Sequence, residues 1–507
     1  DQKQHYLPKL ANGEYIPCFG LTGPNNGSDA TGNIDRAIVV NYNGLIRIKL
    51  TLNKRYITLA PVSNLMGIAF DLKDPNNLLG KSGISVALVE RDHLNLIQET
   101  HHNPLDVGFP NGTIKGDIYL DVDQIIGGSE NIGKGWKMLM ECLSAGRGIS
   151  LPATANASSK VATFGLYHYI QARKQFKLSL SNMEGVQEKF INMMYNTWII
   201  QSSINMTNDI LDEGNSPSVI SAIMKQQTTE RGRIVLNEAM DIHAGSAICV
   251  GYNNFLEKYY KSIPIGITVE GSNTLTRSLI IFAQGLNKSH PHIYPLLLSI
   301  LNDDIHDFKD KFKNIVYHSI NLYGKSFFIF SRYNTDLEQE LIRYATLTNF
   351  VALKGGLLKK EQMLSGDMAD MFSNLYLAIS VQYYENHYNI SPKFSEYVIN
   401  RLLNENRIIM KRVIHNLGPI ERLALSHLAS KPIITNYENE RKIFEEIMEN
   451  PKIIKEVKKN IHIKNTILED LEKFTQLEKK NIYDKSLYDK VINVGEYSNY
   501  ETFKYIK

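Results

Sequence analysis

The chain has 507 residues, of which 43% are hydrophobic and 21% are charged, and this composition excludes a disordered or collagen-like polymer. The length predicts about two to four domains, because a single hydrophobic core stops growing below this size. The 56 Lys and Arg residues are nearly balanced by 53 Asp and Glu residues, so the net charge of +3 argues against a nucleic-acid-binding protein.

The start of the chain indicates a segment of a longer protein. Residues 1–11 have the pattern of a helix end running into a turn, and they contain neither a signal peptide nor a starting Met. No stretch of the sequence approaches the roughly 20 apolar residues needed to cross a bilayer. The three cysteines, Cys18, Cys142 and Cys249, are too few and too scattered for a disulfide framework or a zinc cluster, and they fit a reducing compartment.

Residues 12–128 are predicted to form a β domain. Between residues 45 and 52, apolar Ile and Leu alternate with Arg, Lys and Thr, which is the pattern of a half-buried strand. Further strands are expected around Tyr56, Val86 and Tyr119, separated by clusters of Gly, Pro, Asn and Asp. These elements predict a small antiparallel β-barrel or sandwich.

From residue 129 onward the hydrophobic period becomes helical. Residues 129–288 are predicted to form a helical bundle, and the sequence SHPHIYP at 289–295 marks a boundary. Residues 289–507 are helical again and end in a Lys- and Glu-rich stretch that is typical of a solvated helical face. The fold class is therefore α+β and mainly α.

One glycine-rich segment raises the alternative of a phosphate-binding loop. Residues 128–134 have the spacing G-x-x-x-x-G-K, but Gly135 stands where a Ser or Thr would hold magnesium. We therefore interpret the segment as a turn entering a helix. A nucleoside triphosphatase would instead require Lys134 for binding. No G-x-G-x-x-G sequence follows a strand, which argues against a Rossmann nucleotide site.

Glu270 is the candidate for acid–base chemistry. It ends an Ile- and Val-rich run, where burial would raise its pKa toward the range of a general base, and Gly271 would let a substrate approach the backbone. The alternative is a structural carboxylate paired with an arginine such as Arg277. The histidines at 101–102 and at 290 and 292 lack metal-ligand spacing, so no metal site is predicted and they are interpreted as surface residues.

Four segments together resemble the acyl-coenzyme A (acyl-CoA) dehydrogenase family. Residues 16–32 resemble its flavin-contacting signature, and residues 53–61 resemble the strand that lies against the flavin ring. The sequence ARKQF at 172–176 resembles the family's R-K-x-F element, and residues 268–278 are similar to the segment that carries the catalytic glutamate. The four segments occur in the order and approximate spacing of the family.

The resemblance is closest to the large bacterial acyl-CoA dehydrogenases of fatty-acid β-oxidation, through Tyr56, residues 142–152 and the helical extension after Gly285. It implies that residues 1–11 end a missing N-terminal helical domain. It also implies a bacterial cytoplasmic protein, attached to the inner membrane only through that missing part. The implied partners are a medium- or long-chain fatty acyl-CoA, an electron-transfer flavoprotein as acceptor and a second subunit in a homodimer.

The implied reaction is the FAD-dependent conversion of acyl-CoA to trans-2-enoyl-CoA. Glu270 would remove the α proton, and the flavin would take the β hydride. Arg147, Ser28 and Gly271 are the implied substrate-binding residues. The residues implied to hold FAD are Thr22, Ser28, Tyr56, Thr58, Arg173, Phe176, Gly245, Ser272 and Thr274.

Several alternatives stay open beside this reading. Thr58 also fits ordinary β propensity, and Phe176 also fits an ordinary core residue. The family's glycine-rich adenosine loop is replaced by residues 243–247 (HAGSA), whose added β carbons could crowd FAD. A truncated or degenerate relative that keeps the fold without catalysis is therefore the alternative to an active enzyme.

Overall fold

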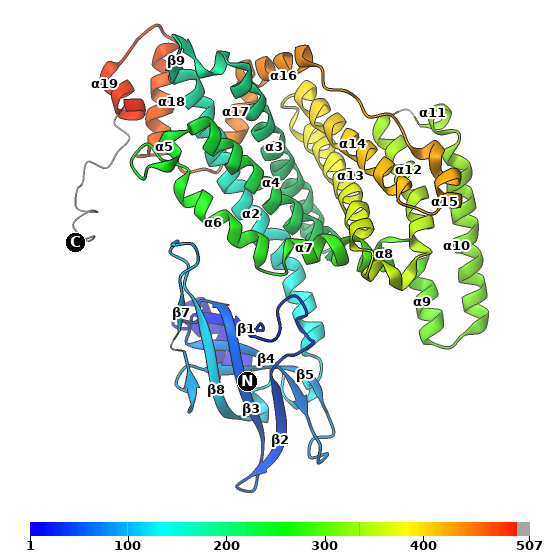
Figure 1. Cartoon of the computed structure of the whole chain (residues 1–507). Helices are drawn as coiled ribbons and strands as arrows, with labels where there is room; N and C mark the ends of the chain where they lie inside the picture. Colours follow the sequence, from blue (N-terminus) through cyan, green and yellow to red (C-terminus); the bar gives the residue numbers. More distant parts are fainter. Residues whose placement is uncertain (99, 216, 334, 494–507) are drawn as a thin grey trace. The chain divides into compact units, whose positions relative to one another are not determined.

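The computed structural model describes residues 1–98, 100–215, 217–333 and 335–493. By their contacts, the residues divide into two compact units, 1–143 and 144–507. The first unit holds the β domain and the second is helical, so the predicted α+β, mainly α fold is confirmed (Figure 1). The domain boundaries predicted from the sequence stay predictions.

In the first unit, helix α1 (Gln2–Ala11) precedes one curled eight-stranded sheet (Figure 1). The strands are β1 (Pro17–Gly20), β2 (Arg36–Tyr42), β3 (Leu45–Thr58), β4 (Leu65–Lys73), β5 (Gly83–Glu90), β6 (Leu96–Ile97), β7 (His101–His102) and β8 (Asn111–Asp121). The order along the sheet is β1-β4-β2-β3-β8-β6, with β5 paired to β4 and β7 paired to β8. Strand β4 runs parallel to β1 and β2, so the sheet is mixed, whereas an antiparallel one was predicted.

The alternation predicted in β3 is present from Ile48 onward and builds the core of this unit, whereas Ile46, expected on the same face, is 40% exposed. Ile48, Leu50 and Leu52 are at most 2% exposed, while Lys49 and Thr51 point to solvent. Burial of one face of the strand in this way sets the register of the β3–β8 pair, because a slip by one residue would turn the apolar side chains outward.

A β-bulge interrupts this register near the end of β3. Lys54 pairs with Ile114, but Ile57 pairs with Gly112, so one extra residue is inserted in β3. Tyr56 takes up the insertion with a positive φ of 61°, a conformation that is unusual for a bulky residue. The bulge therefore directs the Tyr56 side chain out of the regular sheet pattern.

The second unit is a set of packed helices, and α2 (Gly135–Ala172) carries the chain into it. The first part contains α3 (Glu184–Asp212), α4 (Ser218–His243), α5 (Gly245–Ile248), α6 (Glu257–Thr268), α7 (Asn273–Leu275), the π-helical segment η4 (Thr276–Gln284) and α8 (Leu286–Ser289). A short hairpin of β9 (Lys174–Gln175) and β10 (Leu178–Ser179) joins α2 to α3.

The later helices pack on the earlier ones and share their core (Figure 1). They are α9 (Ile293–Leu301), α10 (Ile305–Ser326), α11 (Ile329–Arg332), α12 (Asp336–Ala352), α13 (Gln362–Tyr388), α14 (Pro392–His415), α15 (Pro419–Leu425), α16 (Tyr437–Glu449), α17 (Pro451–Lys458), α18 (Ile467–Glu478) and α19 (Lys485–Tyr488). Trp198 of α3 is 1% exposed and packs edge-on against Tyr384 of α13 and Phe394 of α14. Helices on both sides of residue 288 thus bury a common apolar surface.

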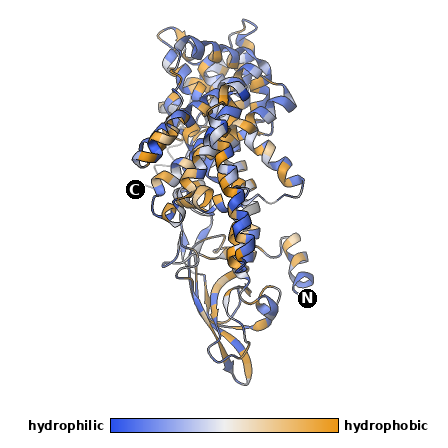
Figure 2. Ribbon diagram, turned by 90° about the vertical axis from the view of Figure 1, so that its right-hand side faces the viewer, coloured by the Kyte–Doolittle hydropathy of each residue, from blue (hydrophilic) through white to orange (hydrophobic). Residues whose placement is uncertain are grey.

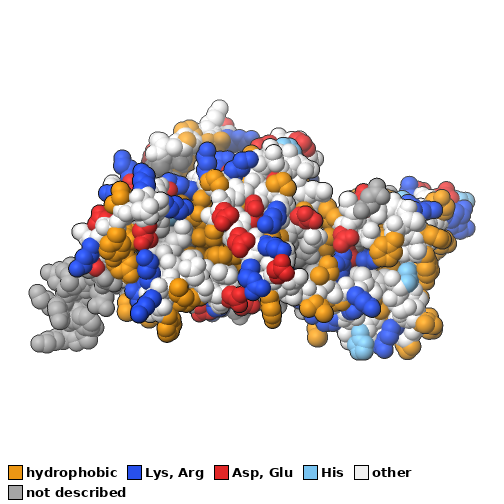
Figure 3. All heavy atoms as spheres, turned by 90° about the horizontal axis from the view of Figure 1, so that it is seen from above, with side chains coloured by type: hydrophobic (Ala, Val, Ile, Leu, Met, Phe, Trp, Pro, Cys, Tyr) orange, Lys and Arg blue, Asp and Glu red, His pale blue; other side chains and the backbone are white. Residues whose placement is uncertain are grey.

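Most helices alternate hydrophilic and hydrophobic residues along their length (Figure 2). Within the described part of the chain, no helix is both long and apolar enough to span a membrane. On the face seen in Figure 3, acidic and basic side chains are interspersed among hydrophobic ones. This mixing is consistent with the near balance of charge in the sequence.

Candidate active site

The candidate base lies in a short connection between α6 and α7. Glu270 and Gly271 both have positive φ angles, 56° and 91°. Glycine adopts this conformation readily, but for glutamate it is strained, and such strain is concentrated at functional sites. The surrounding helices must therefore hold Glu270 in place.

The Glu270 carboxylate is partly buried and incompletely paired. Among the described residues, its Oε2 atom is shielded from solvent and has no hydrogen-bond partner. Burial raises the pKa of Glu270, while the charges of Arg147 and Lys225 lower it. A desolvated carboxylate with a free oxygen suits a general base.

Arg147 is the arginine that faces the base. Burial lowers its pKa and the Glu270 charge raises it, and its Nε atom has no hydrogen-bond partner within the described part of the chain. A β carbon at Gly271 would lie 3.6 Å from Arg147 Nη2 and 3.7 Å from Thr276 Oγ1, so both side chains converge on this glycine. Buried polar atoms left unpaired here are expected where a polar ligand binds.

The alternative pairing of Glu270 with Arg277 is wrong. Arg277 points to α13, where its Nε and Nη2 atoms donate to both oxygens of Asp370 at 2.6–2.9 Å. Its Nη2 atom also donates to Asp367 at 3.2 Å. Arg277 therefore anchors the segment that follows the base and leaves the Glu270 carboxylate free.

Sequence reasoning missed two residues of this site, Lys225 and Asn273. Lys225 of α4 is fully buried and donates hydrogen bonds to the Gly271 carbonyl at 2.6 Å and to Asn273 Oδ1 at 2.8 Å. A signal was present, because residues 225–229 (KQQTT) form a polar run in a helix. Five consecutive residues cover every face of a helix, so part of this run must face the core.

Ser272 and Thr274 follow the base in sequence, as predicted for cofactor contacts. The Ser272 hydroxyl caps α7 by accepting a hydrogen bond from the Leu275 amide at 3.3 Å. Thr274 is exposed, and its carbonyl accepts a hydrogen bond from Ser278 Oγ at 2.6 Å. The Thr274 side chain is thus open to a ligand, while Ser272 already has a capping role.

One cavity gathers residues predicted to hold FAD. It has a volume of about 480 Å³ and is lined by Arg173, Gly245 and Ser246, together with Lys189 and other residues of α2 to α5. Lys189 is paired with Asp241 at 2.7 Å and with Glu238 at 2.9 Å. In the described residues, no carboxylate pairs with Arg173, so its guanidinium is available for an anion such as a phosphate.

Phe176 lies at the tip of the β9–β10 hairpin. It is 90% exposed, so the alternative of an ordinary core residue is wrong. Phe176 and Lys177 both have positive φ angles, 51° and 68°, as a tight two-residue hairpin turn requires. A strained turn that holds an apolar ring in solvent fits a residue that packs against another molecule.

Four predicted flavin residues lie in the first unit. Thr22 Oγ1 donates to the Arg55 carbonyl at 3.0 Å, and the Arg55 amide donates to the Thr22 carbonyl at 3.0 Å, which ties the Thr22 loop to the bulge. Tyr56 is 61% exposed, and Arg55 lies over its ring at 4.7 Å. Thr58 and Ser28 are also exposed. The structure therefore brings Thr22 next to Tyr56.

Two long regions of the chain match models of one protein family. Residues 133–284 match the family described as acyl-CoA dehydrogenase, C-terminal domain, and residues 287–504 match acyl-CoA dehydrogenase, C-terminal, bacterial type. The chain belongs to the acyl-CoA dehydrogenase family. FAD is the cofactor of this family, as the sequence predicted.

Individual proteins that resemble this acyl-CoA dehydrogenase family member match it over part of its length or at low sequence identity. HemX of Proteus mirabilis is 43% identical over 98 residues, which span 18% of this chain and 58% of HemX. An acryloyl-CoA reductase (NADH) of Anaerotignum propionicum is 26% identical over 282 residues, 55% of this chain and 69% of the reductase. A crystal structure of an FAD-complexed acyl-CoA dehydrogenase from Bacillus anthracis has a TM-score of 0.70 at 21% identity, covering 88% of this chain and 78% of that one. This last likeness supports the fold.

The altered loop, residues 243–247, borders the cavity at Arg173. The residues that carry the added β carbons, His243, Ala244 and Ser246, line this cavity, and Ala247 is buried. With these side chains in place the cavity still has a volume of about 480 Å³. Ala244 accommodates the turn at a positive φ of 54°. The expected crowding by added β carbons therefore does not close this cavity.

The other motifs carry no further chemistry. In residues 128–134, the amides of Asn131, Ile132 and Lys134 donate to carbonyls within the turn, and Gly133 donates to Ser85 Oγ, so they cannot cradle a phosphate. Helix α2 begins directly after this turn, which confirms the interpretation from sequence.

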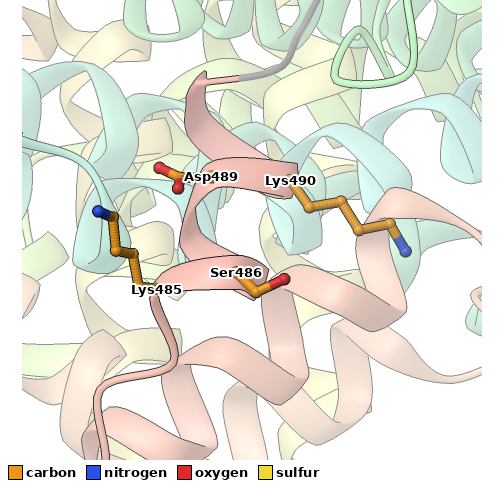
Figure 4. Close-up of a pocket in the computed structure, with 4 residues that line it drawn as sticks. All are labelled: Lys485, Ser486, Asp489 and Lys490. Carbon is orange, nitrogen blue, oxygen red and sulfur yellow. The ribbon is translucent and has the colours of Figure 1, made fainter.

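The histidines at 290, 292 and 318 lie close together. His290 is 8% exposed and packs near His292 and His318, so its assignment to the surface is wrong. The described residues contain no cluster of three or more His, Cys, Asp or Glu that could hold a metal. The hollow in Figure 4 is lined by Lys485, Ser486, Asp489 and Lys490, and Lys490 is already paired with Asp470.

Proposed function

We propose that this chain is an FAD-dependent acyl-CoA dehydrogenase that converts a fatty acyl-CoA to the trans-2-enoyl-CoA, with Glu270 as the base. The observation that carries the proposal is the strained, partly buried Glu270, whose Oε2 atom has no partner among the described residues and whose neighbours are Arg147 and Lys225. This glutamate lies in the segment matched by the family's C-terminal domain.

In the proposed reaction, Glu270 Oε2 receives the proton from the carbon α to the thioester. Burial raises the pKa of Glu270 and so makes this oxygen more basic than a solvated carboxylate, while the charges of Arg147 and Lys225 partly oppose this shift. The space above Gly271, where Arg147 and Thr276 converge, is proposed to receive the thioester end of the substrate. Bound FAD would supply the hydride acceptor for the β carbon.

We propose FAD contacts in each unit, taken separately. Arg173 and Gly245 supply a phosphate-binding cation and an open loop, and Phe176 offers an exposed ring for the adenosine half, from the neighbouring subunit of a homodimer. In the first unit, Thr22, Tyr56 and Thr58 are proposed to contact the flavin ring, with Ser28 at the phosphate and the substrate. Ser272 and Thr274 are proposed cofactor contacts next to the base.

The finer role proposed is the first step of bacterial fatty-acid β-oxidation, on medium- or long-chain substrates and with an electron-transfer flavoprotein as acceptor. The match of residues 287–504 to the bacterial-type C-terminal domain supports this subgroup. The reductase among the relatives favours a second candidate, in which the chain runs the same chemistry toward saturation of an enoyl-CoA.

The test is the visible absorption spectrum of the purified chain with FAD, before and after anaerobic addition of a long-chain acyl-CoA. The proposal predicts a flavin band that bleaches on addition of substrate. A reductase would instead oxidise NADH when an enoyl-CoA is added. A flavin band unchanged by acyl-CoA would contradict the proposed activity, and a chain that binds no flavin would support the degenerate relative.

Substitution Arg173→Ala is expected to weaken FAD retention by about 10- to 100-fold, the loss expected for one hydrogen-bonded charge contact. The control is Lys174→Ala on the same hairpin, because Lys174 is engaged with Glu478 at 3.3 Å. Flavin content after gel filtration measures the effect, and the elution volume reports whether the dimer is retained. Equal flavin content in Arg173→Ala and the parent would count against the assignment of Arg173.

A further inference from the structure

Lys225 makes an unusual set of contacts beneath the base. It is 0% exposed, and its ammonium donates to Gly271 O at 2.6 Å, to Asn273 Oδ1 at 2.8 Å and to Ile267 O at 3.3 Å. An ammonium has three hydrogens, so these contacts use all of them. All three acceptors belong to residues 267–273, on both sides of Glu270.

The Lys225 charge has no ion-pair partner at close range among the described residues. Burial, together with the charge of Arg147, lowers the pKa of Lys225 to about 8, although the charges of Glu270 and Glu230 oppose this shift. Burying a charge without a direct counter-ion costs free energy, so a nonpolar residue would serve packing alone better. The hydrogen bonds to carbonyl oxygens indicate that the ammonium stabilises the conformation of residues 267–273.

Asn273 extends the same network to α4. Its Nδ2 atom donates to Thr229 Oγ1 and to Glu230 Oε1, both at 2.9 Å, while its Oδ1 atom accepts from Lys225. The Thr229 hydroxyl in turn donates to the Lys225 carbonyl at 2.7 Å. Asn273, two residues after Gly271, is therefore fixed to α4, the helix that carries Lys225.

We propose that Lys225 is a positioning residue for Glu270, which holds the left-handed Glu270–Gly271 turn through the Gly271 carbonyl and Asn273 and so keeps the carboxylate aimed. This inference rests on the proposed function of Glu270 as the base. The turn is strained at Glu270, and strained conformers persist only where the surrounding structure over-determines them. Lys225 supplies the hydrogen bonds at this position.

The test compares Lys225→Met with Lys160→Met. Lys160 is a matched control, since it is also buried in the bundle, its pKa is also lowered to about 8, and its ammonium donates to the Lys459 carbonyl at 2.6 Å, outside the base segment. We expect kcat of Lys225→Met to fall about 100-fold, the loss that a misplacement of about 1 Å can cause. The acid limb of kcat/KM against pH should move to higher pH, because the Glu270 carboxylate loses a neighbouring cation.

A second readout does not depend on turnover. Hydrogen exchange of the backbone amides of residues 268–276 should become faster in Lys225→Met and stay unchanged in Lys160→Met. Lys225→Arg keeps the charge but not the shape, so it should restore the acid limb more than kcat; this variant also serves if Lys225→Met does not fold.

The inference is overturned if Lys225→Met matches Lys160→Met in kcat, in the acid limb and in exchange. Each variant is expressed as a ratio to the parent, whose turnover separately tests the proposed function. A parent without turnover would reject Glu270 as the base in this chain, whereas an active parent with an unaffected Lys225→Met rejects only the positioning role.

Discussion

Substitution Glu270→Gln is expected to lower dehydrogenation by about 10⁴-fold while FAD remains bound, because the amide cannot accept the α proton and a positioned general base contributes up to about this factor. The amide has nearly the shape of the carboxylate, so the strained turn and the contacts of Lys225 with Gly271 should be kept. The loss should appear in kcat and kcat/KM together, as for an interaction made in the transition state.

The same substitution should leave stability at neutral pH unchanged or raised. Burial raises the folded-state pKa of Glu270 above its ordinary value, so the folded protein binds this proton more tightly than the unfolded chain. The stability that this group contributes is therefore lost as pH rises through the folded pKa. At neutral pH the ionised carboxylate destabilises the folded protein. Replacement by a neutral amide removes that destabilisation.

Rapid-mixing kinetics of flavin bleaching and chemical denaturation measure the two effects. Glu257→Gln is the control, because Glu257 begins α6, the helix that leads to the base, and is paired with Lys261 at 2.6 Å. Turnover of Glu270→Gln equal to that of Glu257→Gln would place the base elsewhere.

Substitution Arg277→Met is expected to destabilise the second unit by about 2 to 3 kcal/mol, somewhat less than the loss of one partner from a fully buried ion pair, because Arg277 is 33% exposed. Asp370 would lose three contacts with the guanidinium. Asp367 would keep its pair with Arg412 at 2.7 Å. The cost therefore falls mainly on Asp370, on α13.

The pH dependence of this loss has a defined sign. Burial raises the pKa of Asp370, and Arg277 lowers it, so removing the arginine raises the folded-state pKa further. In Arg277→Met the penalty should shrink as the pH falls and Asp370 becomes protonated, since a raised folded pKa favours the protonated folded state. Adding Asp370→Asn should recover part of the loss at neutral pH.

Urea denaturation at several pH values measures these free energies of unfolding. The control is Arg441→Met, whose pair with Glu184 is exposed on both sides and should contribute little. Equal midpoints for Arg277→Met and Arg441→Met would show that the Arg277 cluster does not support the fold. Activity of Arg277→Met below that of the parent would show that the Arg277–Asp370 contact with α13 also supports the segment that carries Glu270.

Much of the fold could be predicted from local patterns. The alternation at Ile48, Leu50 and Leu52 determines one face of β3, and the helical period after residue 135 appears as α2, α3 and α4. The parallel pairing of β4 could not be predicted, because it joins strands that are distant in the sequence. The common core around Trp198 could not be predicted either, because it depends on how α13 and α14 pack on α3.

The sequence by itself determined the family, the α+β class and the candidate base, because these rest on short segments whose residues lie close together in the chain. Only the tertiary structure decided which cations face Glu270. Arg277 is near in sequence but turns toward Asp370, whereas Arg147 and Lys225 come from α2 and α4. A side chain's partner is set by the rotation and packing of whole helices, and short-range patterns do not contain that information.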